Sequence, residues 1–245
     1  MKRPMTLLVA LTVVLSAVSC SSKAGKDEQL LEELSNLDKA TIYDRAETLY
    51  EKEKYTEARK LFAFVYDSFP NDPLGHKAAL RVADTYAAKH DVTNLTEARL
   101  RYRDFANRYP NDPDRDYALL MVGHTFSARK LKPDRDLSPI HEALGAYRQL
   151  VNLYPNSEYA PEAEERMGGL EELLAEHEWL VSEFYFRNKR WVGSKWRLEY
   201  IVENYPDYSK IDQVNERISF IQSKLDEAEA RYKRLIEERT KKIED

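Results

Sequence analysis

The chain has 245 residues, of which 33% are charged and only seven are glycine, a composition suited to exposed helices joined by short loops. Its net charge of −5 argues against a nucleic acid as the main partner. Cys20 is the only cysteine, which excludes an internal disulfide. No stretch of useful length alternates as a strand would, so we expect an all-α protein.

Residues 1–19 have the pattern of a secretory signal peptide. Lys2 and Arg3 precede an apolar run from Met5 to Val18, which is too short to span a membrane. The run leads into Cys20 through Leu15-Ser16-Ala17-Val18-Ser19, which resembles a bacterial lipobox with Ala17 where Leu is usual. The resemblance implies that Cys20 is acylated, and residues 20–38 then form the mature N-terminus and its tether. The alternative is an ordinary signal peptide with an incidental cysteine.

Four segments further along the chain share one spacing. In each of them a small residue stands 12 positions before a proline, and the proline follows an aromatic residue. The four pairs are Ala58 and Pro70, Ala98 and Pro110, Ala143 and Pro155, and Ser194 and Pro206. A small residue lets two helices approach closely, and a proline ends a helix. Each segment therefore predicts the second helix of a helical hairpin.

The chain after residue 38 divides into pairs of helices. In order, the predicted pairs are Thr41–Glu53 with Thr56–Ser68, His76–Lys89 with Thr96–Arg108, Asp116–Ala128 with Ile140–Leu153, Tyr159–Arg187 with Trp191–Asn204, and Ile211–Lys224 with Asp226–Lys242. The second pair has its turn lengthened by Asp91–Asn94, and Gly168-Gly169 is a point where the long fourth-pair helix could bend. Residues 130–139 are polar, contain two prolines and predict a loop.

The spacing resembles the tetratricopeptide repeat (TPR). The small residue, the second aromatic and the terminal proline of that repeat fall on Ala58, Phe62 and Pro70 in the first copy. Successive prolines are 40, 45 and 51 residues apart, longer than the ideal repeat of about 34, so the later units carry insertions. We therefore expect an all-α, TPR-like helical-hairpin solenoid of about five units, the last of them degenerate.

No catalytic constellation is visible in the sequence. The five histidines have no metal-ligand spacing, and there is neither a glycine-rich phosphate loop nor a nucleophile elbow. We therefore expect a protein that is not an enzyme and that needs no metal or cofactor.

Two binding surfaces and one loop are candidates for function. The first surface is basic and aromatic, a combination enriched at binding hot spots, and it comprises Arg187, Lys189, Arg190, Lys195 and Arg197 with the neighbouring Trp191 and Trp196. The alternative is a solvated helix end with Trp191 in the core, and for Trp191 itself we favour the core. The loop residues Asp134, Arg135 and Asp136 either contact a partner or form a surface excursion.

The second surface follows from the TPR resemblance, because the first helix of each TPR unit lines a groove. The resemblance places six residues there: Tyr43, Glu47, Tyr50, Asp84, Tyr117 and His124. Aromatic and polar side chains in such a groove would suit an extended peptide. The alternative is that tyrosines are simply frequent in this chain, which has 16 of them.

Taken together, these features resemble the BamD (ComL-type) family of lipoproteins of the outer-membrane β-barrel assembly machinery. The resemblance covers most of residues 38–208. It rests on the lipobox, the TPR-like units, the Pro133-Asp134-Arg135-Asp136 insertion, the Tyr154-Pro155-Asn156 turn, and a long helix closing on Phe184-Tyr185 and Trp191-Val192.

The resemblance implies a non-enzymatic scaffold, anchored by lipid to the outer membrane and facing the periplasm. Its partners would be the periplasmic POTRA region of the barrel protein BamA, the other lipoproteins of that complex, and unfolded outer-membrane proteins. Residues 39–128 would recognise these substrates, and residues 129–245 would bind BamA. The competing class is another TPR lipoprotein, one that assembles a pilus secretin or organises the cell envelope.

Overall fold

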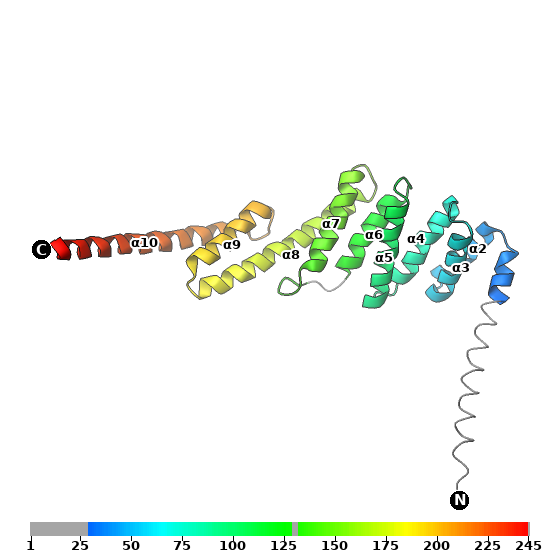
Figure 1. Ribbon diagram of the computed structural model, residues 1–245, viewed down its shortest axis with the longest axis horizontal. Helices are drawn as coiled ribbons and strands as arrows, with labels where there is room; N and C mark the ends of the chain where they lie inside the picture. Colours follow the sequence, from blue (N-terminus) through cyan, green and yellow to red (C-terminus); the bar gives the residue numbers. More distant parts are fainter. Residues whose placement is uncertain (1–28, 129–131, 245) are drawn as a thin grey trace, which may run out of the picture. The chain divides into compact units, whose positions relative to one another are not determined.

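The computed structural model describes residues 29–128 and 132–244. Within these ranges all regular secondary structure is helical, which confirms the all-α, TPR-like fold class (Figure 1). The chain forms two compact units, divided between Lys89 and His90. None of the helices in the described ranges is both long enough and apolar enough to cross a bilayer.

Unit 1 contains a helical segment at residues 29–35 followed by three longer helices. These are α2 (Lys39–Glu51), α3 (Tyr55–Ser68) and α4 (Pro73–Ala87). Helix α3 packs against both α2 and α4, and the core between them is built from aliphatic side chains around Phe62. Asp38 and Asp72 accept hydrogen bonds from the first backbone amides of α2 and α4, so each helix begins where a capping side chain is available.

Unit 2 contains six helices whose consecutive members pack against one another. They are α5 (Val92–Arg108), α6 (Arg115–Ser127), α7 (Ser138–Leu153), α8 (Ala160–Arg187), α9 (Trp191–Asn204) and α10 (Ile211–Glu244). Helices α4 and α5, which the sequence predicts as one hairpin, fall in different units. The predicted division of function at residue 128, with substrate recognition before it and partner binding after it, does not follow from these two units and stays a prediction.

The repeated spacing has the structural meaning that the sequence indicates. Helices α3, α5, α7 and α9 all end two residues before their proline, and the four small residues are fully buried. Gly123 of α6 shows how close the approach is. A Cβ atom built on it would lie 2.2 Å from Cε1 of Tyr147, so only glycine fits beneath that ring.

Two expectations about the connections are wrong. Residues 211–244 form one continuous helix, so the predicted pair Ile211–Lys224 and Asp226–Lys242 does not exist. Neither a glycine nor a proline occurs in this stretch, so nothing stops the helix. The turn at Asp91–Asn94 is shorter than expected, because Asp91 already caps α5 and accepts a hydrogen bond from the Asn94 amide.

Two further predictions concern the loop and the long helix. Residues 132–137 form a loop, as expected, whereas residues 129–131 lie outside the described ranges. Helix α8 runs through Gly168 and Gly169 without a break over 28 residues, or about 42 Å. A Cβ atom on either glycine would meet no other atom within 4 Å, so close packing does not require them.

Candidate functional site

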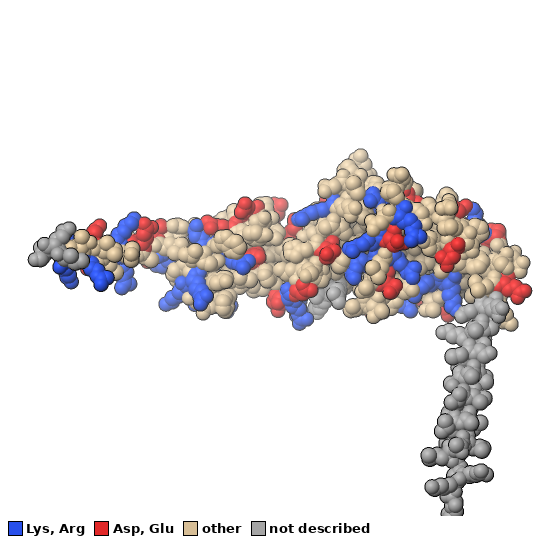
Figure 2. All heavy atoms as spheres, in the orientation of Figure 1, with Lys and Arg blue, Asp and Glu red and all other residues tan. Residues whose placement is uncertain are grey.

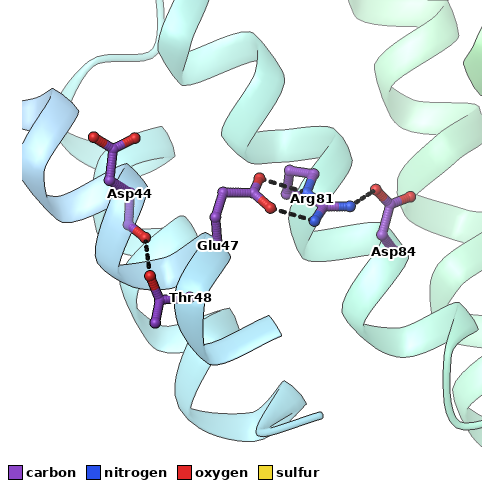
Figure 3. Close-up of polar contacts among 5 residues, drawn as sticks. All are labelled: Asp44, Glu47, Thr48, Arg81 and Asp84. Carbon is purple, nitrogen blue, oxygen red and sulfur yellow. Dashed lines mark hydrogen bonds and ion pairs between the residues drawn. The ribbon is translucent and has the colours of Figure 1, made fainter. Parts of the chain in front are cut away.

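Four of the predicted groove residues lie in unit 1 near Arg81, which the sequence analysis did not single out. Figure 3 shows two of them, Glu47 and Asp84, bonded to this arginine. Arg81 of α4 makes two hydrogen bonds to the Glu47 carboxylate on α2, one of them from Nε at 2.7 Å. Its Nη1 donates to Asp84 Oδ2 at 2.9 Å. The guanidinium group also lies over the Tyr50 ring, 4.0 Å from its centroid. We call Tyr43, Glu47, Tyr50, Arg81 and Asp84 the unit 1 cluster.

Charge and burial in this cluster reinforce one another. Burial alone would lower the pKa of Arg81, but its hydrogen bonds to Glu47 and the charge of Asp84 raise that pKa above the usual value. Burial, followed by the charge of Glu47, raises the pKa of Tyr43, and burial followed by the charge of Asp84 raises that of Tyr50. The cluster therefore keeps a charged guanidinium and neutral phenols at any physiological pH.

The other two predicted groove residues lie in unit 2 and belong to its packing. The Tyr117 ring sits between Tyr102 and Tyr159, at centroid distances of 6.3 and 5.7 Å. The His124 ring packs against Tyr147, and its Nε2 lies 3.2 Å from a carboxylate oxygen of Glu162, an ion-pair distance without good hydrogen-bond geometry. Burial, assisted by the charge of Arg166, lowers the pKa of His124.

The basic surface lies at the turn between α8 and α9. Arg187 is the last residue of α8, Lys189 occupies the left-handed region with φ of 55°, and Arg190 directly precedes α9. All three side chains are exposed, and no carboxylate pairs with them in the described parts of the chain. Figure 2 shows a group of Lys and Arg side chains over this turn.

Two cations on α9 differ from these three because they already have partners. Arg197 Nη1 pairs with Glu178 of α8 at 2.8 Å, and the Lys195 ammonium pairs with Glu199 at 2.6 Å. Glu178 lies on another helix, so the run of basic residues in the sequence gives no sign of this partner. The predicted binding residue Arg197 thus also joins α8 to α9.

The two neighbouring tryptophans differ in their surroundings. Trp191 is partly buried and packs against the apolar core of α8, α9 and α10, with its ring 5.2 Å from Phe186 and 6.4 Å from Phe220. Trp196 is 58% exposed. The packing of Trp191 against the core agrees with the expectation for this residue.

The insertion loop is fastened to α8 rather than hanging free. The Nδ1 atom of His177 lies 2.6 Å from the carbonyl oxygen of Pro133, within hydrogen-bond range. Asp136 accepts a hydrogen bond from the Ser138 amide at the start of α7. Asp134, Arg135 and Asp136 are exposed on this fastened loop. Cys20 and the predicted signal peptide lie outside the described residues.

One further feature of unit 1 escaped the sequence analysis. A hollow of about 500 Å³ lies between the segment at residues 29–35, α2 and α3. Its apolar lining includes Leu30, Leu34, Leu49 and Leu61. The sequence signal for this hollow is weak, because the only large apolar residues between 29 and 38 are four leucines among polar residues, a pattern that predicts a tether.

Comparison with known proteins shows the family of this chain. Residues 35–235 match the family YfiO, described as an outer membrane lipoprotein. This match includes both the unit 1 cluster and the basic surface. The chain belongs to this family of outer membrane lipoproteins.

The similar relatives in this family are named outer membrane protein assembly factor BamD. One from Neisseria gonorrhoeae is 26% identical over 227 residues, which is 90% of this chain and 84% of the relative. One from Xylella fastidiosa is 25% identical over 209 residues, covering 82% of this chain and 69% of the relative. One from Vibrio cholerae is 36% identical over 74 residues, and that match spans only 31% of the relative's length.

Proposed function

We propose that this lipoprotein is a non-enzymatic scaffold of the outer-membrane β-barrel assembly complex. The observation that carries the proposal is the match over residues 35–235 to the outer membrane lipoprotein family, together with relatives named as assembly factors over most of the chain. The described fold supports it, because stacked helical hairpins offer long surfaces for other proteins.

The basic surface is proposed to bind the periplasmic POTRA region of the barrel protein BamA. Arg187, Lys189 and Arg190 lie at one turn and have no carboxylate of their own among the described residues. Unpaired cations on a rigid turn attract a complementary acidic surface and set the orientation of docking. Asp134, Arg135 and Asp136 are exposed in the same unit, and we propose that they contact the same partner.

The unit 1 cluster is proposed to bind unfolded outer-membrane proteins. Arg81 holds the Glu47 and Asp84 carboxylates by hydrogen bonds and lies over the Tyr50 ring, so these groups of the unit 1 cluster are fixed in place. Half-buried tyrosines can pack on the apolar side chains of an extended segment, and the partly exposed Glu47 carboxylate can accept hydrogen bonds from its backbone N–H groups. Tyr117 and His124 are already engaged in the packing of unit 2, so the proposal rests on the residues that converge.

Membrane attachment is proposed to come from acyl chains on Cys20, with the helical units facing the periplasm. Stable anchoring takes more than one acyl chain or a second membrane signal. The other lipoproteins of the complex are expected as further partners.

The experiment that tests the scaffold proposal is a pull-down from detergent-solubilised envelopes with the tagged, acylated protein, followed by mass spectrometry. Recovery of a POTRA-containing barrel protein as the main partner is the expected result. Charge reversal by Arg190→Glu should reduce that recovery, whereas Arg239→Glu, a change at an exposed cation of α10, should not. Recovery of a secretin or of a peptidoglycan-associated complex in place of the barrel protein would overturn the proposal.

A further inference from the structure

The hollow of about 500 Å³ in unit 1 has an apolar lining formed by four leucines. Leu34 and Leu61 are almost completely buried, whereas Leu30 and Leu49 are only partly buried. The hollow opens to solvent, so part of this lining stays in contact with water. A concave apolar surface of this kind is a candidate binding site for an apolar group.

The charged residues around the hollow balance one another. Arg45 of α2 donates from Nη1 to Oε1 of Glu33 at 2.9 Å, which pairs one cation with one carboxylate. The other two charged residues of the lining, Glu57 and Lys60 of α3, are again one acid and one base. The hollow therefore has no net charge that would attract an ionic ligand, and its lining favours an uncharged one.

The remaining polar side chain of the lining is also engaged. The Thr48 hydroxyl donates to the backbone carbonyl oxygen of Asp44, one turn earlier on α2, at 3.0 Å (Figure 3). An extended peptide in the hollow would have to give up water from its own N–H and C=O groups for few new hydrogen bonds. A hydrocarbon chain has no such groups, so the lining suits a fatty acyl chain better than a peptide.

The acylated cysteine expected at position 20 is within reach of the hollow. Nine residues, 20–28, precede Gln29, and Leu30 already belongs to the lining. A fully extended segment of this length spans about 30 Å. Residues 21–28 are Ser-Ser-Lys-Ala-Gly-Lys-Asp-Glu and contain no large apolar side chain. The acyl chains on Cys20 would therefore be the large apolar groups of the mature N-terminus.

We propose that the hollow of unit 1 binds one fatty acyl chain carried by Cys20 of the same molecule. The inference rests on the proposed membrane attachment through Cys20. Two acyl chains suffice for stable anchoring, so a third chain on the same cysteine can lie in the hollow without releasing the protein. The short tether gives this chain a high effective concentration at the hollow. Cys20 would then lie beside the hollow, and this side of unit 1 would face the membrane surface.

Photocross-linking tests the proposal with the full-length, acylated protein in its own membrane. Cells that produce the protein are grown with a fatty acid that carries a diazirine in its chain. The envelopes are irradiated, and the purified protein is digested and analysed by mass spectrometry. The expected product joins the Cys20 peptide, through its acyl group, to a peptide from residues 29–35, α2 or α3.

Two matched variants locate the cross-link. Thr48→Trp places an indole in the hollow and should lower the yield by about tenfold, as expected if about two methylene groups can no longer be buried. Leu31→Trp is the control, because Leu31 is 54% exposed and does not line the hollow. Its yield should stay within about twofold of the wild type.

The intact mass of the purified protein separates this inference from the attachment proposal. A protein without acyl groups on Cys20 would overturn both. An acylated protein that lacks the cross-link would overturn the inference and leave the attachment standing. Two further results would also make the inference wrong: adducts of the hollow with phospholipid acyl chains alone, which would identify membrane lipid as the occupant, and an undiminished yield in Thr48→Trp, which would place the cross-link outside the hollow.

Discussion

Replacing Arg81 by methionine should destabilise unit 1 by about 3 kcal/mol, and the structure shows which contacts would be lost. The variant keeps most of the aliphatic volume but removes the hydrogen bonds to Glu47 and Asp84. The Glu47 side chain is 29% exposed and can rehydrate, whereas that of Asp84 is only 6% exposed and loses its ion pair with Arg81 in a buried position. Breaking a fully buried pair costs about 3–5 kcal/mol, and the partly open rim favours the lower end.

The loss should become smaller when the buried negative charge is removed together with the cation. The double change Arg81→Met with Asp84→Asn should therefore recover much of the stability, because a neutral amide costs less to bury than a carboxylate without its arginine.

Hydrogen exchange measured on peptides from α2 to α4 is the appropriate assay. The three tryptophans, Trp179, Trp191 and Trp196, are all in unit 2, so their fluorescence does not report on unit 1. Exchange protection gives a local free energy of opening for each segment. A loss below about 0.5 kcal/mol for Arg81→Met, or no recovery in the double variant, would refute the idea that Asp84 depends on Arg81.

Three further predictions concern unit 2. Gly123→Ala should lower the free energy of unfolding by about 2–3 kcal/mol in urea unfolding followed by tryptophan fluorescence, because its Cβ atom would collide with Tyr147. Gly145→Ala, whose Cβ atom would meet no atom within 4 Å, should be neutral or stabilising. Equal effects of the two changes would contradict this account of packing. The lowered pKa of His124 means that the unfolded chain takes up its proton first, so stability should fall as the pH drops below about 6.5, and His124→Gln should flatten that part of the profile. A slope as steep in the variant as in the wild type would assign the effect to another group. Removing residues 226–245 should change the unfolding free energy of unit 2 by less than about 0.5 kcal/mol. The side chains from 226 to 242 are exposed, and Figure 1 shows this half of α10 running past α9. A larger loss would show that this half takes part in the packing.

Local rules predicted most of the fold, and tertiary packing decided what they missed. The ends of α3, α5, α7 and α9 follow from prolines, whose effect on the backbone needs no knowledge of the rest of the chain. The predicted turn at residue 225, between the two helices of a fifth hairpin, is wrong because the sequence there has no signal that ends a helix. The engagement of Tyr117 and His124 in the packing of unit 2 depends on their ring contacts with Tyr159 and Tyr147, which the spacing does not encode.

Charge patterns show the same division between what sequence reveals and what packing decides. A run of cations without acids between Arg187 and Arg197 predicts one basic surface, but Glu178 comes from another helix and neutralises Arg197. The Glu178 side chain is largely buried, so an Arg197 variant loses a link between α8 and α9 as well as a surface charge. Weaker partner binding by such a variant would therefore not locate the interface. Arg190 has no such second role among the described contacts, so a change there tests the basic surface directly.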